Sequence, residues 1–124
     1  EEDALMSSIS TGNWGEEKAA SYLKRRGYRI VDRNCRYRQG EIDIVAEKRD
    51  LIIFVEVKTR KNASYAEARE FVTAAKQQRV IAAAQMWMQE NACEKQPRFD
   101  VIEVYSPNGE QSLHIKINHI ENAF

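Results

Sequence analysis

Two apolar runs separated by a short polar break decide the fold: residues 41–46, which read EIDIVA, and residues 51–58, which read LIIFVEVK. The break, KRD at residues 48–50, is typical of a turn. The first run alternates apolar and polar residues, whereas the second is apolar at nearly every position, as in a strand within a sheet. The stretch predicts a β-hairpin whose second strand is buried on both faces.

The flanking sequence supplies helices and further strands. Residues 13–26 carry an apolar face at helical spacing, start with a capping-box-like Asn13 and Glu16, and stop before Gly27. Residues 72–91 have the same helical periodicity. Extended patterns occur at residues 28–37, 99–105 and 113–120. The predicted order is α-β-β-β-α-β-β, an α/β fold with a central mixed sheet of about five strands flanked by helices. A helix between the third and fourth strands implies that this pair is parallel.

Composition indicates one globular domain. The chain has 124 residues, of which 43% are hydrophobic and 31% charged. We assign residues 12–124 to a single domain and expect residues 1–11 to form a flexible N-terminal segment, whose first five residues need not be native. The zero net charge argues against a protein that coats nucleic acid through overall charge.

Cysteine usage and hydropathy bear on the compartment. Cys35 and Cys93 lack the spacing of a zinc site, and two thiols weakly favour a reducing environment. The sequence starts without the features of a signal peptide and has no apolar run long enough to cross a membrane. We therefore expect a cytoplasmic location and no membrane partner.

The hairpin gathers acidic residues and a lysine. Because side chains alternate along a strand, a short turn places Asp43 across from Glu56 and Glu41 across from Lys58. A longer turn shifts the pairing by two residues but keeps the faces. The ordinary alternative is ion pairing on a solvated face, such as Glu41 with Lys58.

A metal site fits this arrangement better than ion pairing does. Carboxylates facing each other across two strands repel, and a divalent cation removes the conflict. The carbonyl of Val57 would be a further ligand. Lys58 would orient a water molecule or offset negative charge on phosphoryl oxygens. The pattern predicts a Mg²⁺- or Mn²⁺-dependent phosphodiesterase.

Basic residues supply candidate contacts to nucleic acid. Residues 24–38 contain seven basic residues and one acid, which indicates either a solvated surface or a phosphate-facing stripe. Arg60 follows Lys58 on the same strand face, and Lys76 and Arg79 lie near the start of the second helix. The candidate residues for binding nucleic acid are Arg36, Arg38, Arg60 and Lys76.

Three further polar residues remain outside this pattern. His114 and His119 are an odd number of residues apart, so a strand would place them on opposite faces and they would chelate a metal poorly. Asp100 lies in an apolar strand, where it is either a hydrogen-bonded core residue or a support for the site.

A longer pattern resembles a known family. The segments that carry it are GNWGEEKA (12–19), YL (22–23), GY (27–28), RNCR (33–36), GEIDIVA (40–46), FVEVKTR (54–60), RFDV (98–101) and HIENAF (119–124). They resemble the largely uncharacterised bacterial YraN family of the restriction-endonuclease-like PD-(D/E)XK superfamily, which is similar in fold to archaeal Holliday-junction resolvases. Ile42 stands where the superfamily motif has proline.

The resemblance implies residue roles. By position, Asp43, Glu56 and Lys58 match the catalytic trio, and Glu16 matches the helix-borne acid of resolvase-like members. Glu16 would then join Asp43, Glu56 and the Val57 carbonyl as a metal ligand, besides any role as a helix cap.

Three classes of function remain open. The first is a metal-dependent nuclease acting on DNA, including branched or recombination intermediates, for which a homodimer would suit the cutting of two strands. The second is a repair-accessory module that binds nucleic acid without cleaving it. The third is a protein-interaction module with no nucleic-acid partner.

Overall fold

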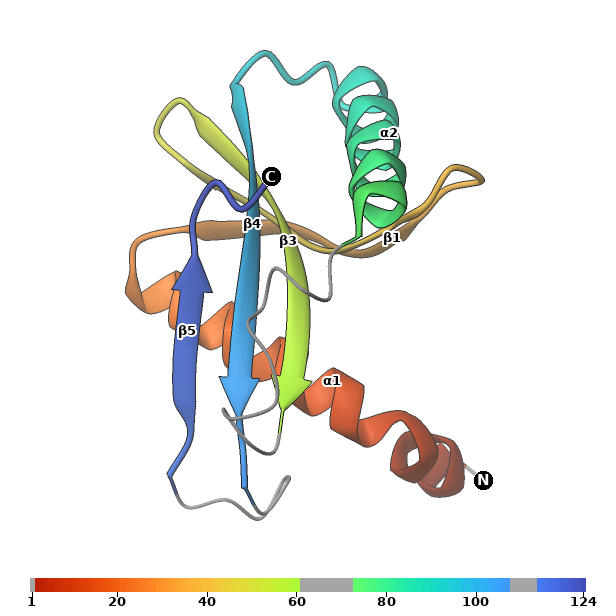
Figure 1. Cartoon of the computed structure of the whole chain (residues 1–124), viewed down its shortest axis with the longest axis vertical. Coiled ribbons are helices and arrows are strands. Elements are labelled where there is room, and N and C mark those ends of the chain that lie inside the picture. Colours follow the sequence, from red (N-terminus) through yellow and green to blue (C-terminus); the bar gives the residue numbers. More distant parts are fainter. Residues whose placement is uncertain (1, 61–72, 108–113) are drawn as a thin grey trace.

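The computed structural model describes residues 2–60, 73–107 and 114–124 (Figure 1). Side chains are described from residue 14 onward. Its elements are α1 (Glu2–Arg25), β1 (Arg29–Arg36), β2 (Glu41–Lys48), β3 (Leu51–Arg60), α2 (Ala74–Glu90), β4 (Gln96–Tyr105) and β5 (Lys116–Ile120). The predicted order of helices and strands and the α/β class are confirmed.

Within the described residues, the strands form one mixed sheet of five in the order β1-β2-β3-β4-β5. Neighbours pair antiparallel except β3 and β4, which are parallel because α2 carries the chain back across the sheet. Lys48 pairs with Leu51, so the central hairpin has the tight two-residue turn that aligns Asp43 with Glu56.

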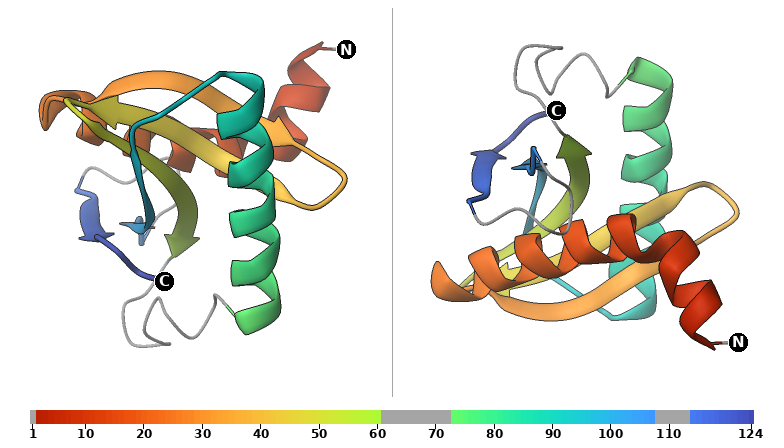
Figure 2. Two further views of the ribbon diagram at one scale, coloured as in Figure 1. Left: turned by 90° about the horizontal axis from the view of Figure 1, so that it is seen from above. Right: turned by 90° about the horizontal axis from the view of Figure 1, so that it is seen from below.

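The helices cover opposite faces of the sheet and run crosswise to each other (Figure 2). On the α1 side, Ala19, Ala20 and Leu23 of the helix pack against buried aliphatic residues of β2, β3 and β4. Under α2, Ala83, Ala84 and Trp87 pack on Val45, Ile52 and Phe54. β3 is therefore buried on both faces, as its continuous apolar run predicts.

Three elements start three or more residues away from the predicted position. α1 starts at Glu2, so Asn13 lies inside the helix and is not its cap; a single cap contributes about 1 kcal/mol and does not prevent a helix from extending past it. β4 starts at Gln96 and includes Pro97. β5 pairs with β4 only from Val101 onward, so the missing N–H of Pro97 removes no hydrogen bond to β5. β5 starts at Lys116, and residue 113 lies outside the described part. The flexibility expected for residues 1–11 stays a prediction.

None of the helices described here has the length and apolar character that a membrane crossing requires.

Candidate functional site

The antiparallel ladder between β2 and β3 ends where the acidic residues begin. Its last pair is Ile44 with Val55, and the same register places Asp43 opposite Glu56, as predicted. Beyond that pair, the Val57 N–H donates to Asp43 Oδ2 at 2.8 Å. An aspartate side chain thus accepts the hydrogen bond that a backbone carbonyl of β2 would otherwise accept, and this fixes the carboxyl group beside Val57.

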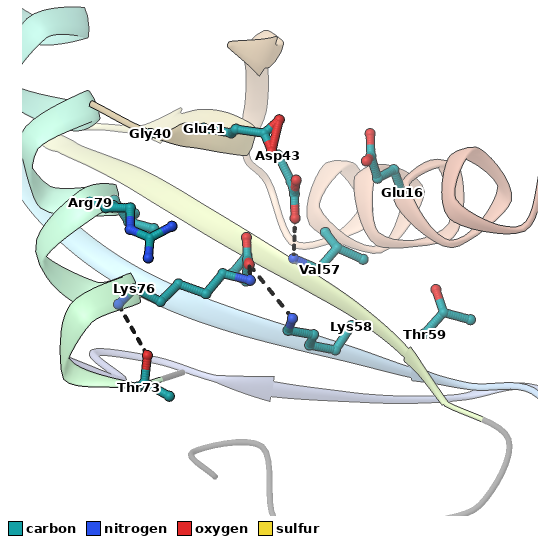
Figure 3. A pocket seen from close by; sticks show the side chains of 12 residues that line it. Glu16, Gly40, Glu41, Asp43, Val57, Lys58, Thr59, Thr73, Lys76 and Arg79 are labelled. Atoms are coloured by element: carbon teal, nitrogen blue, oxygen red, sulfur yellow. Dashed lines mark hydrogen bonds and ion pairs between the residues drawn. The ribbon is translucent and has the colours of Figure 1, made fainter. Parts of the chain in front are cut away.

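These residues line a cavity of about 700 Å³ between the β2–β3 pair, α1 and the first turns of α2 (Figure 3). Its charged lining residues are Glu16, Glu41, Asp43, Glu56, Lys58, Lys76 and Arg79. The elements that meet here are far apart in sequence, and α2 contributes two of the three cations. The cavity therefore combines an acidic floor on the strands with a basic wall on the helix.

Asp43 is hard to ionise in this environment. Burial, together with the negative charge of Glu56, raises the pKa of Asp43 to about 8 against the opposing hydrogen bond from Val57. The neighbouring carboxyl group of Glu56 therefore favours the protonated form of Asp43. Asp43 holds a proton where a cation could bind.

Two lysines contact the other member of the pair. Glu56 is 7% exposed, and its Oε1 contacts Lys76 Nζ and lies 3.8 Å from Lys58 Nζ. Burial and the neighbouring Lys76 lower the pKa of Lys58. Burial is the largest single effect on Lys76 and lowers its pKa, but the hydrogen bond to Glu56, together with the interactions with Lys58 and Asp43 and the charge of Glu56, outweighs burial, so the pKa of Lys76 is raised.

Glu16 lines the cavity without joining the acidic pair. Figure 3 shows its carboxylate on α1, set apart from Asp43. Its Oε1 is buried, lies 3.7 Å from Arg33 Nη2 and accepts no hydrogen bond from the described residues. Burial raises the pKa of Glu16 despite opposing interactions with Asn34 and Arg33. In the described part of the chain, no three His, Cys, Asp or Glu side chains gather closely enough to hold a metal.

The donor atoms at the acidic pair nevertheless suit a hard divalent cation. The N–H and C=O groups of one strand residue point to the same side, so the Val57 carbonyl faces the gap that Asp43 borders. Two carboxylates and a carbonyl are oxygen donors, and Mg²⁺ commonly takes one or two carboxylates while keeping several waters. The unsatisfied Glu16 Oε1 is an acceptor available to such a water molecule.

Asp100 belongs to a separate buried network rather than to the cavity. It is 0% exposed and accepts two hydrogen bonds from Arg98, at 2.8 and 2.7 Å, and one from the Asn122 N–H at 3.0 Å. His119 Nε2 lies 2.8 Å from Asp100 Oδ2, and its Nδ1 lies 3.1 Å from Tyr22 Oη. Asp100 is therefore a satisfied polar residue of the core, and His119 has a structural role.

Comparison with known proteins places the chain. A family model described as "Uncharacterised protein family UPF0102" matches residues 15–104. The chain belongs to this family. It is 45% identical over 117 residues to a UPF0102 protein of Syntrophotalea carbinolica, covering 94% of this chain and 92% of that protein. A UPF0102 protein of Symbiobacterium thermophilum is 44% identical, with 94% and 98% covered.

Family membership confirms the coarser part of the predicted resemblance, an uncharacterised family with bacterial members. The family match includes every residue of the acidic pair and its lysines, since residues 15–104 contain Glu16, Asp43, Glu56, Lys58 and Lys76. The relatives carry no functional name, so their names contribute nothing to the chemistry of the cavity.

The basic residues predicted to bind nucleic acid lie in different surroundings in this UPF0102 protein. Lys76 lines the cavity, and Arg36 and Arg38 are exposed on and beside the end of β1, Arg36 with its Nε 3.4 Å from Glu41. The side chain of Arg60 is 10% exposed, and its Nε donates to buried Glu103 at 2.8 Å. Arg60 is therefore less accessible to a phosphate than the other candidates.

Two residues that shape the site, Arg79 and Gly15, are not among the site residues predicted from the sequence. Arg79 lines the cavity together with Lys76, and the i, i+3 spacing of these residues would have placed them on one helix face. Gly15 lets α1 approach β3 closely, because a Cβ there would lie 2.1 Å from Thr59 Oγ1. No local signal in the sequence indicates this contact.

Proposed function

We propose that this protein is a metal-dependent nuclease that hydrolyses phosphodiester bonds in DNA, including branched DNA. The observation that carries the proposal is the close approach of Asp43 and Glu56 beside Lys58 on the floor of an open cavity. Glu56 and Lys58 form an acid–x–lysine sequence on β3, and the neighbouring strand β2 carries Asp43. This arrangement also supports the predicted relationship with the PD-(D/E)XK superfamily.

The residues divide the work as follows. Asp43, Glu56 and the Val57 carbonyl would hold Mg²⁺ or Mn²⁺, which when bound polarises a phosphoryl oxygen and acidifies a water molecule. Lys58, half-buried beside Glu56, would orient the attacking water or offset charge that develops on the phosphate. Glu16 would accept a hydrogen bond from a water in the cavity. Arg79 and Lys76 would attract the phosphate backbone from the helix side.

Ordinary ion pairing explains the cavity less well. Glu41, the predicted partner of Lys58, instead lies 3.4 Å from Arg36 Nε. Asp43 is placed beside Glu56 although burial and the negative charge of Glu56 disfavour the ionisation of Asp43. Ionisable groups with perturbed pKa values in a cleft are typical of functional sites rather than of surface salt bridges.

A second candidate is a module that binds nucleic acid without cutting it. Its support is that Glu16 stays near Arg33 and does not complete a cluster of three carboxylates in the described residues. The two proposals differ in one readout, which is cleavage at bound substrate.

Cleavage assays with labelled DNA test the proposal. Duplex, single-stranded and four-way-junction DNA are incubated with Mn²⁺ or Mg²⁺, and Glu56→Gln and Lys58→Met are expected to lower cleavage by 10²-fold or more. Glu41→Gln is the matched control, because it removes an exposed carboxylate of the same cavity and should retain activity. Cleavage that persists unchanged in Glu56→Gln would sink the proposal. Salt-dependent binding without cleavage by wild type would favour the second candidate.

A further inference from the structure

Lys76 takes an unusual position for a basic residue. It lies in the first turn of α2, where its backbone N–H donates to Oγ1 of the N-cap Thr73 at 3.2 Å. That turn reads Ala-Ala-Lys-Gln and carries no acidic side chain. A cation is disfavoured there because the N-terminal end of a helix already carries partial positive charge. The position therefore needs a compensating anion, which the opposite wall of the cavity supplies.

The compensating anion is Glu56. The Lys76 ammonium reaches from α2 across the cavity to Glu56 Oε1, and Figure 3 shows its side chain extended toward β3. Lys58 Nζ lies 3.8 Å from that same oxygen. One oxygen of Glu56 thus already has two cationic neighbours, and the nearer one comes from another element of the fold.

We propose that Lys76 is a built-in cation that competes with the divalent metal for Glu56. The proposal rests on the proposed metal-dependent function, because it concerns the same carboxylate. In the metal-free protein Lys76 neutralises Glu56 and keeps the acidic pair stable. When the metal binds Glu56, the Lys76 ammonium gives up that oxygen and becomes available to a substrate phosphate at the cavity mouth.

The competition predicts the direction in which metal affinity changes when Lys76 is removed. Removing Lys76 leaves Glu56 without its nearer cation, so metal affinity should rise. Removing Arg79 deletes the same charge from the same cavity wall one turn along α2. Arg79→Met therefore reports the general effect of losing one positive charge, and any excess in Lys76→Met reports the direct contact with Glu56.

Isothermal titration calorimetry with MnCl2, without nucleic acid, tests the proposal on the full chain. We expect Lys76→Met to bind Mn²⁺ about tenfold or more tightly than wild type, with a much smaller gain for Arg79→Met. Lys76→Arg, which keeps a cation at this position, should remain near wild type. Circular dichroism melting of each variant verifies the fold, and Lys76→Gln takes the place of Lys76→Met if Lys76→Met fails to fold.

The outcomes separate this inference from the proposed function. Equal gains in Lys76→Met and Arg79→Met, or no gain in either, would overturn the competition while leaving the metal site in place. Absence of Mn²⁺ binding by wild type and by every variant would instead overturn the proposed function, and the inference with it. Tighter binding confined to Lys76→Met supports the inference.

Discussion

Asp43 owes its raised pKa to burial and to the balance of two neighbours, Glu56 and Val57. Burial and the charge of Glu56 raise its pKa, whereas the Val57 N–H works in the opposite direction. Because the folded protein retains the Asp43 proton to about pH 8 while the unfolded chain loses it near 3.8, folding takes up a proton between these values. By linkage, the free energy of unfolding contributed by this residue decreases as pH rises through that window.

The first prediction follows from that sign. With EDTA present, the urea midpoint of wild type should fall between about pH 5.5 and about pH 7.5, and Asp43→Asn should remove most of that slope. The lowered pKa values of Glu17, Glu47 and Asp100 act at lower pH, whereas the raised pKa of Glu16 adds a slope of the same sign that Asp43→Asn retains. Glu41→Gln is the control and should keep the wild-type slope. Identical slopes in wild type and Asp43→Asn would show that Asp43 ionises normally.

The second prediction concerns the buried network. Asp100→Ala leaves Arg98 and His119 without their shared acceptor and should lower the free energy of unfolding by about 3–5 kcal/mol. His119→Phe removes one partner but leaves Asp100 paired with Arg98, so it should cost less. Urea denaturation followed by circular dichroism measures both. A loss for Asp100→Ala no larger than for His119→Phe would mean that the carboxylate is not the centre of the network.

At the scale of elements, the approach of α1 to β3 depends on Gly15. A Cβ at this position would lie 2.1 Å from Thr59 Oγ1, so the helix could not keep its distance from the strand. In a free helix, alanine is favoured over glycine by about 1 kcal/mol, and the contact should reverse this preference. Glu16 follows Gly15 directly, so the same contact positions Glu16 at the cavity.

The third prediction is a change of sign in a double-mutant cycle. Gly15→Ala alone should destabilise the protein by about 1–3 kcal/mol because it overpacks the helix–strand contact. In a Thr59→Ala background, where Oγ1 is absent, the same substitution should become stabilising by up to about 1 kcal/mol. Thr59→Ser keeps the hydroxyl and should not rescue. Urea unfolding of the six proteins decides, and additive effects would exclude the contact.

At the scale of the whole molecule, the fold divides the basic run of residues 24–38. Arg26 lies beyond the end of α1, over the ring of Tyr22. Arg33 Nη1 pairs with Glu17 at 2.8 Å. Arg38 is exposed in the β1–β2 turn, close to cavity-lining Gly40. The run therefore does not form one continuous stripe: Arg33 is engaged by Glu17 and by cavity-lining Glu16, whereas Arg38 stays exposed near the cavity.

The fourth prediction separates these positions. Arg38→Ala should weaken DNA binding and reduce the slope of log affinity against log salt by about 1, whereas Arg26→Ala should leave both nearly unchanged. Fluorescence anisotropy across a salt series, with Ca²⁺ in place of Mg²⁺, measures both quantities. Equal effects from the two substitutions would place the DNA elsewhere on the surface.

Residue periodicity was enough to predict the order of helices and strands and the position of Asp43 opposite Glu56. The continuous apolar run of β3 indicates a strand between two layers, and a two-residue turn fixes the register of the hairpin. These features are local, since each depends on side chains within one or two neighbouring elements. Family membership likewise depends on sequence alone.

The contacts that complete the cavity depend on segments distant in sequence. Lys76 reaches Glu56 only because α2 crosses back over the sheet, and Glu16 lies beside Arg33 because α1 packs on the opposite side of the hairpin. The burial that raises the pKa of Asp43 is also a product of these layers. The acidic pair was therefore determined by the sequence of the hairpin, whereas its counter-charges and its proton were decided by the packing of both helices.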